Sequence, residues 1–171
     1  MVLESLAAIL HRDLATAARE VEAYPDETGI WAPVPGLPNT GGVLVRHVSG
    51  NLQHFVGAVL GATGYRRDRD AEFGAPPWPR ARLLAELETT SRVVAGTLPS
   101  LALQRLQAPY PQPVAQQTLT TLDFLIHLAV HCGFHLGQLD YHRRAVSGAS
   151  ISVAPMSIPA LASARAAAPA G

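Results

Sequence analysis

The chain has 171 residues, of which 48% are hydrophobic, and this is enough for one domain with its own buried core. Thirteen arginines balance thirteen acidic residues, and there is no lysine. A net charge of zero argues against nonspecific nucleic-acid binding and membrane-surface binding, because both need clustered positive charge. The single cysteine, Cys132, excludes an internal disulfide and is typical of a reducing compartment.

Membrane insertion and export are not indicated. The richest apolar run, residues 119–139, is interrupted by Asp123, three histidines and Gln138, and so falls short of the ~18 apolar residues that a membrane span requires. The first residues carry Glu4 and lack the basic region of a signal peptide. We therefore expect a cytoplasmic protein without membrane or nucleic-acid partners.

Four stretches have apolar residues at helical spacing, and none reads as a strand. The first predicted helix, 2–24, ends at Tyr24-Pro25, since proline disfavours helix in the preceding residue. The second, 42–60, has Asn39 or Thr40 as its N-cap. The third, 79–97, opens on Pro79, and the fourth covers 120–146.

Four helices of about twenty residues predict an all-α four-helix bundle over residues 1–147. The connections 25–41 and 65–79 are long enough to cross the end of the bundle, so the topology need not be up-down-up-down. The Ala- and Pro-rich tail, 148–171, is expected to pack on a neighbour as far as Leu161 and to be frayed beyond it.

Histidines concentrate on two of the predicted helices. The second carries His47 and His54, and the fourth carries His127, His131, His135 and His142. At ~100° per residue, His131 and His135 lie ~40° apart on one face, and His47 and His54, seven residues apart, also share a face. Two imidazoles one turn apart, with a third from a facing helix, form a metal site that leaves positions open for water or substrate.

An isolated H-x-x-x-H pair is more often polar surface or hydrogen-bonded core than a metal site. Here the fourth helix is apolar on nearly every side and is therefore expected to be buried. Burying imidazoles without partners costs about 1–3 kcal/mol each, a cost that a metal ion removes. Spacing alone leaves both His47 and His54 open as the third ligand.

Three segments resemble the DinB/YfiT-like superfamily of metal-binding four-helix bundles. They are RHVSGNLQHFVGAVLG (46–61), RDRDAEF (67–73) and HLAVHCGFHLGQLDYHRR (127–144), and the most specific element is H-x-x-x-H-x-G-Q, from His131 to Gln138. The resemblance covers about residues 1–146. It implies an up-down-down-up bundle and frequent dimerisation. Characterised relatives include transferases that use the low-molecular-weight thiol bacillithiol and an isomerase that depends on mycothiol.

The resemblance also implies roles for particular residues. His47, His131 and His135 correspond to the metal ligands, with Zn or Ni the expected ion and Fe an alternative. Asn51 and Gln138 are expected to orient these ligands by accepting a ring N–H. His54 and His127 are the best candidates for a general base, although His54 has an alternative as a plain polar residue at the bundle end. We prefer that alternative for His142.

Two other features have simpler interpretations. The alternating charges of residues 66–72 are interpreted as a solvated, salt-bridged loop with an Asp N-cap rather than a substrate clamp. Cys132 is interpreted as a small buried hydrophobe and not as a nucleophile. Apolar residues on both sides of the fourth helix predict a homodimer, unless the tail covers the second side.

Two functions follow as hypotheses. The first is a metal-dependent enzyme acting on a small-molecule substrate, either a transferase using a low-molecular-weight thiol or a hydrolase. The second is a non-enzymatic, metal-stabilised binding or stress-related bundle whose site is vestigial. A pocket leading to the metal would favour the enzyme, and a solid apolar plug would favour the structural role.

Overall fold

The computed structural model describes residues 1–153 and 156–167, and its architecture is helical. The long helices are α1 (Val2–Glu22), α3 (Gly41–Leu52), α6 (Arg80–Thr97) and α7 (Thr121–Ser147). Short helices are α2 (Glu27–Ile30), α4 (Val59–Gly61), α5 (Arg69–Gly74), η2 (Leu98–Ser100), η3 (Leu103–Leu106) and η4 (Ile158–Ala160). Only isolated bridges, and no strand, occur in these residues, so the all-α prediction is confirmed.

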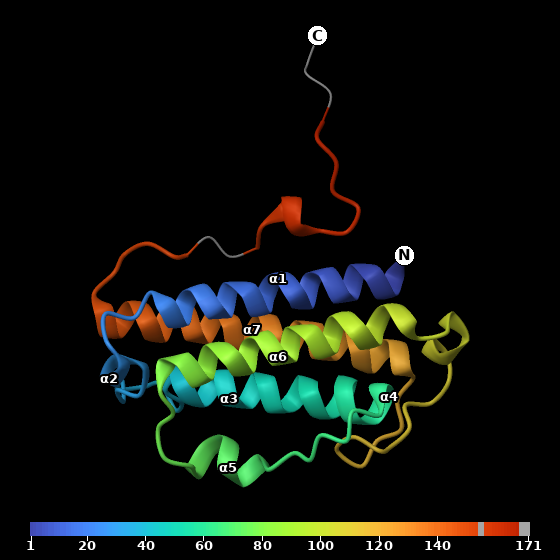
Figure 1. Cartoon of the computed structure of the whole chain (residues 1–171), viewed down its shortest axis with the longest axis horizontal. Helices are drawn as coiled ribbons and strands as arrows, with labels where there is room; N and C mark the ends of the chain where they lie inside the picture. Colours follow the sequence, from blue (N-terminus) through green and yellow to red (C-terminus); the bar gives the residue numbers. More distant parts are fainter. Residues whose placement is uncertain (154–155, 168–171) are drawn as a thin grey trace.

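The four long helices pack into a bundle with the expected pattern of directions. Figure 1 shows α1 and α7 running one way, with α3 and α6 running the other, which is an up-down-down-up arrangement. The core between them is aliphatic, and its fully buried side chains include Leu10 and Leu14 of α1, Leu83 and Leu87 of α6, and Leu125 of α7. Burial of each such side chain contributes about 1.5–3 kcal/mol to folding.

Hydroxyl caps begin the two helices that carry the histidines. Thr40 Oγ1 accepts a hydrogen bond from the Val43 amide (3.4 Å), and Thr120 Oγ1 accepts one from the Asp123 amide (3.1 Å). Each cap satisfies a backbone N–H that has no partner within the helix. Of the two N-caps considered for the second helix, Thr40 is the one used.

The second predicted helix is not uniform. After α3 the chain forms a π-helix, η1 (Gln53–Ala58), before the short α4. Such wider turns are rare and occur frequently at functional sites. His54 lies in η1, so its direction relative to His47 differs from that of a regular α-helix.

The connection between α3 and α6, which the sequence showed only to be long enough to cross the end of the bundle, runs back along it (Figure 1). Because α3 and α6 point the same way, the chain must return the full length of α3, and it does so with α5 on the outside (Figure 1). Asp68 is the N-cap of helix α5, and its Oδ1 accepts a hydrogen bond from the Ala71 amide at 2.9 Å. The topology thus lays residues 62–79 over α3.

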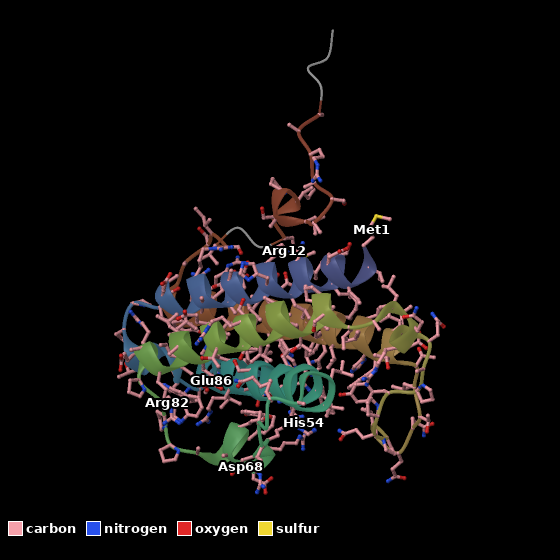
Figure 2. The ribbon with its side chains drawn as sticks, turned by 45° about the vertical axis from the view of Figure 1, so that its right-hand side comes forward. Met1, Arg12, His54, Asp68, Arg82 and Glu86 are labelled. Atoms are coloured by element: carbon pink, nitrogen blue, oxygen red, sulfur yellow. The ribbon has the colours of Figure 1, made fainter. Side chains whose placement is uncertain are left out.

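Helix α7 ends at Ser147, and Gly148 follows with a φ of +68°, a left-handed conformation that favours glycine. The tail then passes beside α1 (Figure 1), and Arg12, labelled in Figure 2 on this side, donates to Met156 Sδ at 3.4 Å. Arg143 donates to the carbonyl of Ile151 at 3.0 Å. The expected fraying beyond Leu161 falls partly on residues 168–171, outside the described residues.

Within residues 1–153 and 156–167, the helices are too short or too polar to cross a membrane.

Candidate metal centre

Three histidines from two helices meet on one side of the bundle. His47 projects from α3, and His131 and His135 project from consecutive turns of α7. The Nε2 atom of His131 lies 3.3 Å from Nε2 of His47 and 3.0 Å from Nε2 of His135. One ligand atom from each residue lies within 4.8 Å of the other two. Imidazoles bound to one ion at ~2.0–2.1 Å bring their nitrogens about 3 Å apart, which agrees with the two short separations.

The hydrogen bonds on the far side of two rings fix their tautomers. Nδ1 of His47 lies 2.9 Å from Oε2 of Glu72, and Nδ1 of His135 lies 2.7 Å from Oε1 of Gln138. Both partners are acceptors, so each Nδ1 carries a hydrogen and each neutral ring has a lone pair on Nε2. A single Nε2–H on His131 cannot satisfy both lone pairs. The lone pairs of the clustered Nε2 atoms therefore fit a bound metal cation.

Glu72 was not anticipated as part of this site. It lies on α5, its side chain is 5% exposed, and both of its oxygens are engaged: Oε2 with His47, and Oε1 with Nε of Arg67 at 2.6 Å. The interpretation of residues 66–72 as a solvated, salt-bridged loop with an Asp N-cap is confirmed for the Asp68 cap and for the Arg67–Glu72 salt bridge, but Arg67 and Glu72 are largely buried and not solvated. The sequence contained a signal for the role of Glu72, because an acidic residue in the loop that follows a histidine-bearing helix can orient a metal-bound imidazole.

The site favours neutral histidines and an ionised carboxylate. Burial, together with the nearby His135 and His47, lowers the pKa of His131 to about 4. Burial also lowers the pKa of His135, against the opposing hydrogen bond to Gln138. Burial opposes ionisation of Glu72, but hydrogen bonds from His47 and Arg67 outweigh it and hold the pKa of Glu72 below its usual value. At neutral pH the imidazoles of His131 and His135 are thus in the neutral form that binds metals.

The two sides of the cluster differ in packing. Behind His135, toward the core, lies an apolar cavity of about 10 Å³, room for about one water molecule. On the outer side the rings of Phe73 and Phe134 contact His47 and His135, with centroid separations of 5.1 and 5.3 Å, and both phenylalanines are exposed. The outer side of the cluster, between α5 and α7, is thus lined by exposed aromatic rings.

The two proposed bases lie at one end of the site. His127 is exposed, stacks on Phe124, and has its ring centroid 6.0 Å from that of His131. His54 points from η1 to the side of the bundle that also carries Asp68 (Figure 2), and its Nε2 lies 3.2 Å from Nε2 of Gln112. Its Nδ1 is buried without a hydrogen-bond partner among the described residues. Neither base is one of the three clustered histidines.

Two predictions about the remaining polar residues need correction. Asn51 does not orient a ligand: its Oδ1 is buried and has no partner among the described residues, because Glu72 already occupies Nδ1 of His47. His142 is not a plain polar residue, since it is 1% exposed. Its Nδ1 accepts from the Tyr24 hydroxyl at 2.7 Å, and its Nε2 donates to the Ala32 carbonyl at 2.9 Å. Cys132 is buried, as expected.

The fold and the histidine cluster define the class: an all-α bundle of four long helices with a three-histidine candidate metal site. A sequence model of the DinB superfamily matches residues 9–139, about three quarters of the chain. The chain belongs to the DinB superfamily. Comparison with the curated proteins and with the solved structures gave no match.

Proposed function

We propose that this protein is a metal-dependent enzyme in which His47, His131 and His135 bind a divalent transition metal, Zn or Ni first and Fe as an alternative. The observation that carries the proposal is the convergence of the three ligand atoms within 4.8 Å, with two rings locked in the metal-binding tautomer. Three protein ligands leave coordination positions for substrate, as in catalytic zinc sites.

The reaction that we propose is transfer of a low-molecular-weight thiol to an electrophilic substrate, with hydrolysis as the second possibility. A bound ion supplies Lewis acidity and lowers the pKa of a coordinated thiol or water. The nucleophile comes from outside the chain, because burial raises the pKa of Cys132 to about 12 and keeps that thiol protonated. We place the reaction in the cytoplasm.

The chain's own residues set the conditions for this chemistry. Glu72 and Gln138 hold two ligand rings in place through their Nδ1–H groups. Phe73 and Phe134 limit the access of water from the outer side. For the general base we favour His54 over His127, because burial lowers the pKa of His54 and leaves it neutral and able to accept a proton at pH 7.

Metal analysis followed by a turnover assay tests the proposal. Protein purified without a histidine tag should hold one equivalent of transition metal, and His131→Ala should lose it. The metal-loaded protein should then conjugate a small thiol such as mercaptoethanol to chlorodinitrobenzene faster than the His131→Ala variant does. His11→Ala, which changes an exposed histidine on α1, is the matched control and should retain metal and activity.

A non-enzymatic, metal-stabilised bundle is the alternative. The cavity behind His135 is small and apolar, which favours the non-enzymatic alternative because it leaves no room for a substrate on the core side. The exposed outer side of the cluster disfavours this alternative. In that case metal would raise the unfolding temperature while neither thiol transfer nor ester hydrolysis exceeded the rate of the His131→Ala variant.

We also propose that the protein is a homodimer joined through the outward face of α7. Four large apolar side chains on this face are exposed: Ile126 (47%), Val130 (66%), Phe134 (62%) and Tyr141 (66%). They follow helical spacing on the side opposite the buried residues of α7. The tail does not cover them, because it passes beside α1 (Figure 1).

The pattern on α7 is complementary to itself. An antiparallel pairing centred between Gly133 and Phe134 sets Ile126 opposite the second copy's Tyr141 and Val130 opposite its Gly137. In the same register Asp123 faces the second copy's Arg144, so opposite charges meet at both ends. Nothing lies within 4 Å of a methyl group placed on Gly137, which leaves room there for a large partner side chain. Two-fold pairing of identical faces is the commonest form of oligomer.

A further inference from the structure

The side chain of Arg67 lies beside the candidate metal site and is only partly engaged. Its Nε and Nη2 donate to Oε1 and Oε2 of Glu72 at 2.6 and 2.8 Å, and Nη2 is 3.5 Å from Nδ1 of His47. Its third nitrogen, Nη1, makes no hydrogen bond within residues 1–153 and 156–167, and it is not enclosed by protein. The guanidinium is thus fixed by Glu72 while one NH2 group remains available.

The neighbours of Arg67 connect it to His127, which lies beside the candidate ligand His131. Its guanidinium carbon lies 5.6 Å from the ring centroid of Phe55, and Phe55 packs on Phe124 at 5.0 Å. His127 stacks on the same Phe124 at 5.9 Å and neighbours the candidate ligand His131. Arg67 and His127 are therefore linked through the ring pair Phe55–Phe124, in which Phe124 is buried, next to the candidate metal ligands.

The polar groups around this ring pair carry positive charge or donate hydrogen bonds. They are Arg67, the His54–Gln112 pair and His127. The carboxylate in contact with them, Glu72, has both oxygens occupied, and Asp68 caps α5 through its own Oδ1. The charge of Arg67 adds to the burial that lowers the pKa of His54. Neither of these carboxylates pairs with Nη1 of Arg67.

We propose that Arg67 binds an anionic group of the substrate, a carboxylate in the simplest case, while the reacting atom of the substrate is held at His47, His131 and His135. This inference rests on the proposed function and narrows its substrate class to anions. A guanidinium already held in place by a carboxylate is preorganised for a second one, and charge-assisted hydrogen bonds of this kind are about twice as strong as neutral ones.

A pair of matched thiols tests the inference. Cobalt-substituted protein is titrated with mercaptopropionate and with mercaptopropanol, and binding is followed by the thiolate-to-cobalt charge-transfer band. The wild type should bind mercaptopropionate about tenfold more tightly than mercaptopropanol. Arg67→Met should abolish this preference, so that the two thiols bind with equal affinity. Arg66→Met, at the exposed neighbouring arginine, should retain the preference.

The outcomes separate the two proposals. Equal affinities for the two thiols in the wild type would overturn the anion site, as would an Arg67→Met variant that loses both thiols equally, which would mean that Arg67 acts only by positioning Glu72. A failure of cobalt to bind would instead contradict the metal site. If cobalt binds but neither thiol gives a charge-transfer band, the proposal of thiol transfer fails. Titration with propionate then tests the anion site by itself. A change in the cobalt spectrum that depends on Arg67 supports the anion site, and no change rejects it.

Discussion

The carboxylate of Glu72 lies 2.9 Å from Nδ1 of His47, on the opposite side of the ring from the nitrogen that faces His131. The two residues are 25 positions apart in sequence and lie on different helices. A carboxylate behind a metal-binding histidine fixes the ring, selects its tautomer and increases its basicity. This pair is therefore the main support of the candidate site outside the three ligands.

Replacing Glu72 with glutamine should weaken metal binding. The substitution keeps the shape of the side chain but removes the charge that holds the His47 ring and pairs with Arg67. We expect a loss of about 10–100-fold in metal affinity, measured by competition with a chromophoric chelator. Asp70→Asn, which changes an exposed carboxylate on the same helix, is the control and should leave affinity unchanged. An unaltered affinity in Glu72→Gln would contradict the orienting role.

Replacing Gly50 with alanine should disturb the same pair indirectly. A methyl group at Gly50 would overlap Oε1 of Glu72 and lie 3.0 Å from its Cδ, so the carboxylate would have to move away from α3. We expect a reduced metal affinity, as in Glu72→Gln. Gly96→Ala serves as control, because no atom lies within 4 Å of its added methyl group. That control should stabilise α6 by about 0.5–1 kcal/mol without affecting metal.

The metal-free protein should lose stability as the pH falls from about 6.5 to about 4. Folding lowers the pKa of His131 to about 4, whereas an unfolded histidine titrates near ~6.5. Between these pH values the unfolded state binds more protons than the folded state. The free energy of unfolding therefore decreases as the pH falls. Urea unfolding at about pH 7 and about pH 5 measures the decrease, and His131→Gln should reduce it. Identical decreases in the two proteins would rule out this contribution.

The buried Tyr24–His142 hydrogen bond should contribute to stability and not to the site. Tyr24→Phe removes the donor to Nδ1 of His142 and leaves a buried ring nitrogen without a partner. The expected cost is about 1–3 kcal/mol in the free energy of unfolding, with metal content unchanged. Tyr141→Phe, at an exposed tyrosine, should cost nothing measurable in stability. A loss of metal in Tyr24→Phe would mean that this bond supports the site after all.

The α7 dimer should respond to both the apolar face and the charge register. Val130→Glu places a charge within the proposed interface and should give a monomer by sedimentation, whereas Leu103→Glu, at an exposed leucine outside α7, should not. Asp123→Arg should weaken the dimer, and adding Arg144→Asp should restore it, because opposite charges then meet again. A wild-type monomer at micromolar concentration would refute the dimer, and a failure of the double variant would refute the register.

The sequence determined the positions of the long helices and the common face of two candidate ligands, His131 and His135. Apolar spacing located the four long helices, and Thr40 and Pro79 marked helix starts, because these signals are local. The four-residue spacing of His131 and His135 likewise fixed their common face before any packing was known. The choice of His47 over His54 came from the family resemblance and not from spacing.

Only the tertiary structure decided the remainder. The parallel direction of α3 and α6 forces the connecting chain back over α3, and this return brings Arg67 and Glu72 to His47. No periodicity in the sequence encodes such a contact, since it depends on how the helices are arranged. The π-helix at Gln53–Ala58, which carries His54, was not predicted from the sequence either. The burial of His142 against Tyr24 likewise depends on packing between segments far apart in the chain.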